Sequence, residues 1–212
     1  MTFATNHIGP FALTEALIPH LPDGVNVVFV ASAVEDPERK PAKMAGFRGS
    51  RYLSAEASAR GEWNPGGSKM PGADAYATSK QCNLATVLAF ARETPRLRFN
   101  AVEPGLNPGT GLGRDANVAI RLLSKYLAAP LAPFIKGWST PERAARMITD
   151  VLTDRSDRTG MYFDESGKPM TGSGQVRDPA FANRVVAETR QLLAAIPMGT
   201  APSGPVEAAH RS

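Results

Sequence analysis

Short runs of β-branched and apolar residues alternate along this chain with longer segments of helical periodicity. The run Val25-Asn-Val-Val-Phe-Val30 predicts a strand buried on both faces, as in a parallel sheet. Residues 97–102 and 160–164 predict two further strands. Apolar residues recur at helical spacing in four other segments, which are 3–21, 74–93, 140–152 and 178–193. The alternation predicts an α/β fold in which helices flank a parallel sheet.

Prolines mark where several of these helices begin, bend or end. Pro10 lies inside the first helical pattern, so we expect it to bend or interrupt that helix, which Pro22 ends. Thr140 and Pro141 have the residue types of an N-cap and a first helical position, and they predict the start of the third helix. Pro95 separates the second helix from the second strand. The prolines therefore predict the boundaries of the helices between the strands.

The length of 212 residues fits one domain with a core of its own. Segment 35–72 is rich in Gly, Pro, Ser, Arg and Glu and has weak periodicity, which predicts a surface insertion. Residues 196–212 are mostly Pro, Gly, Ala and Ser, and they predict a disordered tail. We therefore expect one domain over residues 1–195.

Charge and cysteine content argue against several classes of protein. The net charge is +4, but the basic residues are scattered, so no nucleic-acid partner is expected. Cys82 is the only cysteine, which excludes a disulfide framework and favours a reducing, cytoplasmic location. His7, His20 and His210 have no partner at metal-ligand spacing, so no metal site is expected. The chain has neither a signal-peptide pattern nor an apolar stretch of about eighteen residues, so no membrane span is expected.

Tyr76 and Lys80 are four residues apart in a predicted helix, so their side chains share one face. A tyrosine with an ordinary pKa of about 10 is a poor acid–base group at neutral pH. A nearby ammonium favours the phenolate and lowers that pKa, and the pair can then exchange a proton with a substrate oxygen. Ser32, at the end of the first predicted strand, can hold the same oxygen with its hydroxyl. By itself a Tyr-x-x-x-Lys spacing also occurs by chance in many helices.

The segment Asp74-Ala-Tyr-Ala-Thr-Ser-Lys-Gln-Cys-Asn-Leu84 resembles the active-site helix of short-chain dehydrogenases/reductases, including the usual Ser before the Lys. Three further segments match in the order of that family. Residues 6–14 resemble the helix with the active-site Asn, 27–32 the strand that ends in the catalytic Ser, and 103–110 the Pro-Gly loop beside the nicotinamide. The resemblance covers about residues 1–195 and leans toward the retinol dehydrogenase and protochlorophyllide reductase-like branch.

This resemblance implies an NAD(P)-dependent oxidoreductase that interconverts a carbonyl and an alcohol. Tyr76 would be the general acid/base, and Lys80 would lower its pKa and hydrogen-bond the nicotinamide ribose. Ser32 would orient the substrate oxygen, and Asn6 would hold a water in the proton relay. The residues expected to contact NADP or NAD are Tyr76, Lys80, Pro104, Gly105, Leu106 and Thr110.

The resemblance also suggests the kind of substrate. Residues 111–138 occupy the position of the family's substrate lid, directly after the Pro-Gly loop. The Leu, Ala, Pro and Phe content of residues 120–138 favours an apolar small molecule. A homo-oligomer is expected only by analogy with the family.

The family's glycine-rich phosphate-binding turn, Thr-Gly-x-x-x-Gly-x-Gly, does not occur in this chain. The glycine-rich run 107–113 comes after Tyr76 and cannot take its place. The expected fold is therefore a partial Rossmann-like doubly wound parallel sheet that lacks the N-terminal strands and leaves an exposed edge at residues 25–30. The sequence leaves two functions open. One is an oxidoreductase, and the other is a catalytically inactive, truncated remnant or interaction module that does not bind the cofactor.

Overall fold

The computed structural model describes residues 1–105 and 138–196. The described strands form one sheet in the order β1-β2-β3-β4, with bounds β1 (Asn26–Val30), β2 (Arg98–Val102), β3 (Met161–Phe163) and β4 (Pro169–Met170). The first three strands are parallel, and β4 runs antiparallel to β3. The predicted α/β class with a parallel sheet is confirmed, whereas the short strand β4 was not predicted. The predicted lid and tail lie outside the described residues, except for Trp138 and Ile196.

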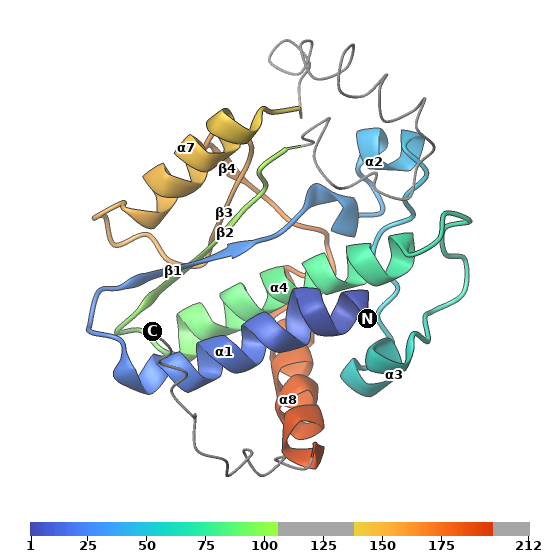
Figure 1. Cartoon of the computed structure of the whole chain (residues 1–212), viewed down its shortest axis with the longest axis horizontal. Helices are drawn as coiled ribbons and strands as arrows, with labels where there is room; N and C mark the ends of the chain where they lie inside the picture. Colours follow the sequence, from blue (N-terminus) through green and yellow to red (C-terminus); the bar gives the residue numbers. More distant parts are fainter. Residues whose placement is uncertain (106–137, 197–212) are drawn as a thin grey trace, which may run out of the picture.

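Helices cover both faces of this sheet (Figure 1). The long helices are α1 (Gly9–Leu17), α4 (Ala73–Glu93), α7 (Pro141–Leu152) and α8 (Pro179–Ala195). The short ones are η1 (Ala4–Ile8), η2 (Ile18–His20), η3 (Ala33–Glu35), α2 (Lys40–Met44) and α3 (Ala55–Arg60). Figure 1 shows α7 on one side of the sheet and α1 and α4 on the other, and α8 packs against α4. Thr140 caps α7 by accepting a hydrogen bond from the Arg143 N–H, as its residue type predicts.

The two-residue alternation of the strands divides the apolar side chains between two cores. Phe99 and Ala101 of β2 belong to the larger core beneath α4, whereas Val102 belongs to a smaller core beneath α7. In the larger core, the ring of Phe90 lies 5.3 Å from that of Phe11 and 5.4 Å from that of Phe99, between ring centres. Phe90 is fully buried, so helices α1 and α4 and strand β2 meet at this aromatic cluster.

Strand β1 forms one edge of the sheet in the described part of the chain, because β2 is its one partner there. The expected exposed edge is therefore present. Burial on both faces was also expected, and that expectation is wrong. Val30 is 41% exposed and Asn26 to Val28 are half-buried, because an edge strand has solvent beside it.

Pro10 does not end the first helix. The turn before it is wider than an α-turn, and the Gly9 N–H donates to the carbonyl oxygen of Ala4, five residues earlier. The proline ring therefore lies in the first turn of α1, where its missing N–H leaves no partner unsatisfied. The helix widens at the proline and then continues.

Segment 35–72 is only partly a surface insertion, because it contains α2 and α3 and contributes to the core. Tyr52 is 3% exposed, and its hydroxyl donates to Glu188 of α8 at 2.7 Å. The Tyr52 ring packs edge-on against Phe181 of the same helix, with ring centres 5.6 Å apart. These contacts fix the insertion to α8, and sequence periodicity gives no sign of them.

Polar contacts connect α8 to the other helices on its side of the sheet. Arg190 reaches Glu15 of α1 and Glu93 of α4, each at 2.7 Å. His7 is fully buried and lies 3.1 Å from both Asn83 of α4 and Thr189 of α8. Burial lowers the pKa of His7 to about 4, so its imidazole is neutral at pH 7, consistent with a structural role.

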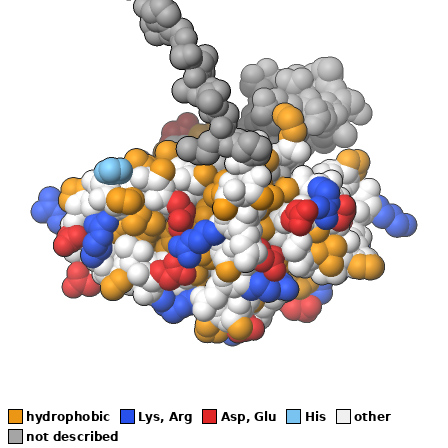
Figure 2. Space-filling view, turned by 90° about the horizontal axis from the view of Figure 1, so that it is seen from below, with side chains coloured by type: hydrophobic (Ala, Val, Ile, Leu, Met, Phe, Trp, Pro, Cys, Tyr) orange, Lys and Arg blue, Asp and Glu red, His pale blue; other side chains and the backbone are white. Residues whose placement is uncertain are grey.

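The view from below (Figure 2) shows charged side chains of both signs scattered among hydrophobic ones, and neither sign forms a continuous field on that face. Exposed apolar residues include Leu13 and Leu17 of α1. Among residues 1–105 and 138–196, no helix combines the length and the apolarity needed to cross a membrane.

Candidate active site

Tyr76 and Lys80 lie on the first turns of α4, on one face of the helix as their spacing predicts. The Lys80 Nζ is 5.5 Å from the centre of the Tyr76 ring. It donates a hydrogen bond of 2.9 Å to the carbonyl oxygen of Val30, the last residue of β1. The pair is therefore fixed beside the carboxyl end of a parallel strand, where ligands bind in sheets of this kind.

Ser32 follows β1 and is 8% exposed. Its hydroxyl acts on the side chains of both Tyr76 and Glu103 and lowers the pKa of each. The structure thus brings Ser32 close to Tyr76 and Lys80, which lie more than forty positions later in the sequence. A substrate oxygen held by the Ser32 hydroxyl would lie next to the Tyr76 phenol.

Asn6 lies in the wide turn η1 and forms hydrogen bonds with α4 through both its side-chain amide and its backbone carbonyl. Its Nδ2 donates to the Ser79 hydroxyl at 3.3 Å, and its carbonyl oxygen accepts from Asn83 Nδ2 at 2.9 Å. The Ser79 hydroxyl in turn donates to the Tyr76 carbonyl oxygen at 2.7 Å. Asn6 is thus adjacent to the active-site helix, but its hydrogen bonds go to Ser79 and Asn83 rather than to the Tyr76 or Lys80 side chains.

The Pro-Gly loop begins at the carboxyl end of β2. Gly105 has φ of 77°, in the left-handed region that favours glycine, and its N–H donates to Glu103 Oε1 at 3.2 Å. Pro104 and Gly105 therefore lie at the same edge of the sheet as Ser32. The other two residues of the predicted nicotinamide contact, Leu106 and Thr110, lie outside the described residues.

The pKa of Tyr76 is raised above its ordinary value, first because of burial and second because of the negative charge of Glu103. The hydrogen bond with Ser32 acts in the opposite direction. Burial likewise lowers the pKa of Lys80, against the effect of Glu103. The pKa of Tyr76 is therefore raised, and not lowered as was expected from Lys80, because burial and the charge of Glu103 both raise it. Tyr76 is a protonated phenol at neutral pH.

Glu103 is the site residue to which sequence reasoning assigned no role. It directly follows Val102, so the alternation of β2 places it on the α4 side of the sheet, and it is 9% exposed. Its Oε2 accepts hydrogen bonds from the Ala33 N–H and, at 3.4 Å, from the Tyr162 hydroxyl. A charged residue at the carboxyl end of a predicted parallel strand was the signal available in the sequence.

The described residues suit one end of a dinucleotide. Lys80 has three N–H donors and gives one to Val30, which leaves donors for the hydroxyl groups of a ribose. Within the described ranges, β1 leads into Ala31-Ser32-Ala33 and no strand leads through a glycine-rich turn into a helix N-terminus. Lys80, which the family resemblance predicts to hold the ribose, therefore has N–H donors left for it, and the described part contains no pyrophosphate-binding turn.

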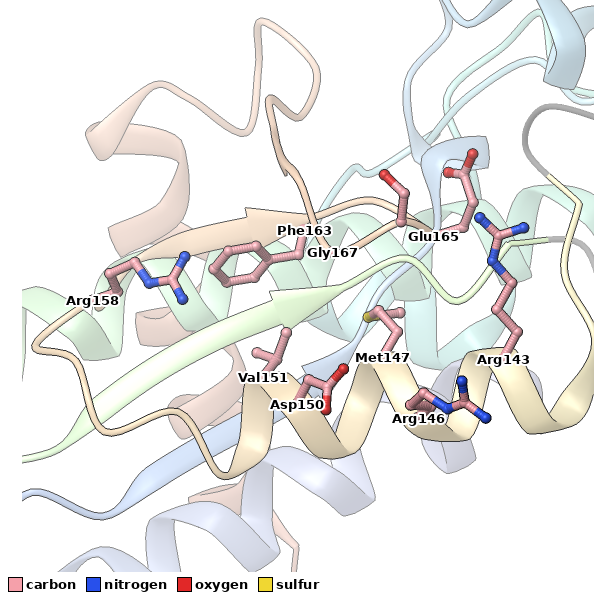
Figure 3. A pocket seen from close by; sticks show the side chains of 10 residues that line it. Arg143, Arg146, Met147, Asp150, Val151, Arg158, Phe163, Glu165 and Gly167 are labelled. Carbon is pink, nitrogen blue, oxygen red and sulfur yellow. The ribbon is translucent and has the colours of Figure 1, made fainter.

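A separate cavity of about 390 Å³ lies on the α7 side of the sheet (Figure 3). Met147 and Val151 of α7 and Phe163 of β3 line it, and the guanidinium of Arg158 lies 5.2 Å from the centre of the Phe163 ring. Figure 3 shows Arg143 and Arg146 at the same cavity. Because α7 and α4 cover opposite faces of the sheet, this cavity is not part of the Tyr76 site.

Comparison with curated proteins finds protochlorophyllide reductases. A protein from Hordeum vulgare is 29% identical over 122 residues, which cover 54% of this chain and 29% of that protein. One from Chlamydomonas reinhardtii is 27% identical over 189 residues, which cover 84% of this chain and 47% of that protein. One from Pisum sativum is 25% identical over 201 residues, which cover 85% of this chain and 47% of that protein. The matched part of the chain thus spans between 29% and 47% of the length of these relatives.

No family model matches the chain. Among solved structures, an uncharacterized protein from Mycobacterium paratuberculosis is similar with a TM-score of 0.51 and 23% identity. The similarity covers 91% of this chain and 58% of that chain, and it supports the partial Rossmann-like α/β fold.

Proposed function

We propose that this distant relative of the protochlorophyllide reductases, in the short-chain dehydrogenase/reductase family, carries the catalytic portion of an oxidoreductase that uses NADP or NAD and reduces a carbonyl group on an apolar small molecule. The observation that carries the proposal is the contact of Ser32 with Tyr76 beside Lys80 at the carboxyl ends of β1 and β2. That the relatives found by sequence are reductases supports the reaction class.

Each residue of the site has a defined task in this reaction. Ser32 donates a hydrogen bond to the carbonyl oxygen and holds it next to the Tyr76 hydroxyl. Tyr76 gives its proton to that oxygen as negative charge develops there. Lys80 holds the nicotinamide ribose with the N–H donors that Val30 leaves. When bound, the nicotinamide supplies the hydride for reduction.

The raised pKa of Tyr76 favours the direction of reduction. A phenol that keeps its proton at neutral pH can donate it to a carbonyl, whereas oxidation of an alcohol needs the phenolate as a base. Burial and Glu103, which raise this pKa, therefore suit a reductase better than an alcohol-oxidising dehydrogenase.

A series of unbranched aldehydes of increasing length tests the proposal, with NADPH consumption followed by absorbance. Residues 120–138 are rich in apolar side chains, and each buried methylene contributes about 0.8 kcal/mol, so kcat/KM should rise up to about fourfold per added carbon. A small polar aldehyde of equal carbon number serves as the control. Turnover that is independent of chain length would contradict the apolar substrate, and absence of any turnover would favour the noncatalytic alternative.

A further inference from the structure

The cavity on the α7 side of the sheet has an apolar floor and a charged rim (Figure 3). Met147, Val151 and Phe163 line it and are 6%, 7% and 2% exposed, so they lie at its floor. Arg143 and Arg146 of α7 line it as well and are exposed, so they lie at its rim. The floor favours an apolar part of a ligand, because burial of apolar surface is favourable.

Arg143 and Arg146 carry positive charges that no described side chain balances. Among the described residues, neither guanidinium forms an ion pair. The two residues are three positions apart, so they are neighbours on α7, where like charges repel each other. Arg143 also lies in the first turn of the helix, where the helix dipole disfavours a cation. The stability of α7 therefore does not account for these charges, whereas a bound anion would offset them.

Arg158 lines the cavity at the end next to Phe163 and has partners of its own (Figure 3). Its guanidinium lies 5.2 Å from the centre of the Phe163 ring, and its Nη2 donates to Asp154 Oδ2 at 2.8 Å. The positive charge of Arg158 is therefore already balanced.

Two acidic side chains also line the cavity, and their places give it a direction. Figure 3 shows Asp150 beside Val151 and Glu165 at the end where Arg143 lies. At that end one carboxylate stands against the two guanidiniums of Arg143 and Arg146, so the end keeps a net positive charge. Asp150 repels an anionic group placed over the apolar floor. An anionic group is thus directed to the arginines.

We propose that this cavity binds a small molecule in which a carboxylate or a phosphate group is joined to an apolar body. Arg143 and Arg146 bind the anionic group, since guanidinium N–H donors match both kinds of oxyanion. The apolar body covers Met147 and Val151. The volume of about 390 Å³ lies in the lower part of the range for small-molecule sites, which is about 300–1,000 Å³. This inference goes beyond the proposed function and does not depend on it.

NMR spectroscopy of the 212-residue chain with ¹³C-labelled methionine methyl groups tests the inference, with phenyl phosphate and phenylacetate as probes. The resonance of Met147, assigned with Met147→Leu, should shift saturably with at least one of the two. The probe with the lower Kd identifies the preferred anionic group. Inorganic phosphate lacks the apolar body, so it should bind at least about tenfold more weakly than phenyl phosphate.

Arg143→Gln and Arg146→Gln should each raise the Kd of the better probe by about two- to fivefold, because each removes one exposed charge pair. Both positions are exposed, so the variants should stay folded, which circular dichroism would establish. Arg177→Gln is the matched control, because Arg177 is also exposed but does not line the cavity, and its Kd should equal that of the wild-type chain.

Three results would overturn the inference. They are a Met147 resonance that responds to neither probe, equal affinity for inorganic phosphate and phenyl phosphate, and an unchanged Kd when both Arg143 and Arg146 are replaced. The readout needs neither a nicotinamide cofactor nor turnover, so its result stands apart from that of the proposed function.

Discussion

Replacing Tyr76 with phenylalanine is expected to lower kcat for carbonyl reduction by roughly a hundred- to ten-thousand-fold and to leave the fold intact. The substitution removes the hydroxyl alone. The ring keeps its contact with Phe47, whose centre lies 6.3 Å away, and Tyr76 is only half-buried. Because the proton donor is lost and the substrate pocket is unchanged, KM should change little. Steady-state kinetics with NADPH and the best aldehyde of the series would measure both constants.

Tyr52→Phe is the matched control for this experiment. The Tyr52 hydroxyl donates to Glu188 of α8 and not to Ser32, Tyr76 or Lys80, so its loss should reduce stability and leave kcat unchanged. Circular dichroism would establish that both variants are folded. A Tyr76→Phe protein with wild-type kcat would show that another group donates the proton.

Replacing Phe90 with alanine should destabilise the chain by about 3–5 kcal/mol. Phe90 is fully buried between the rings of Phe11 and Phe99, and three elements contact one another at this point. A change of this size is a large share of the stability of an ordinary domain, which is about 5–15 kcal/mol. Urea denaturation followed by circular dichroism would measure the free energy of unfolding.

Leu13→Ala on α1 gives the comparison for Phe90→Ala. Leu13 is 61% exposed, so its truncation should change the free energy of unfolding by less than about 0.5 kcal/mol. If the two variants were equally stable, the aromatic cluster would not be the centre of the core.

Much of the fold was predictable because local signals determine it. Thr140 and Pro141 marked the start of α7, and the helical spacing of apolar residues in 74–93 marked α4. The wide turn before Pro10 was not predictable, because its geometry depends on the packing of η1 against α4. The burial of Tyr52 depends on α8, which lies more than a hundred residues later in the chain.

The candidate site was predicted in part, for a similar reason. The spacing of Tyr76 and Lys80 and the place of Ser32 after a strand are local features, and the structure brings these residues together. The raised pKa of Tyr76 was not predicted, because it depends on burial and on Glu103, which is 27 positions away in the sequence. Electrostatic effects of this kind depend on the tertiary structure, and a spacing rule cannot supply them.

A titration of the 212-residue chain with NADPH and NADH, followed by nicotinamide fluorescence and thermal shift, would test whether this site binds a nicotinamide cofactor. We expect saturable binding through the nicotinamide and its ribose, and weaker binding by Lys80→Met, which removes the donors to the ribose. A chain that is folded by circular dichroism and binds neither nucleotide would contradict the proposal that this site uses a nicotinamide cofactor.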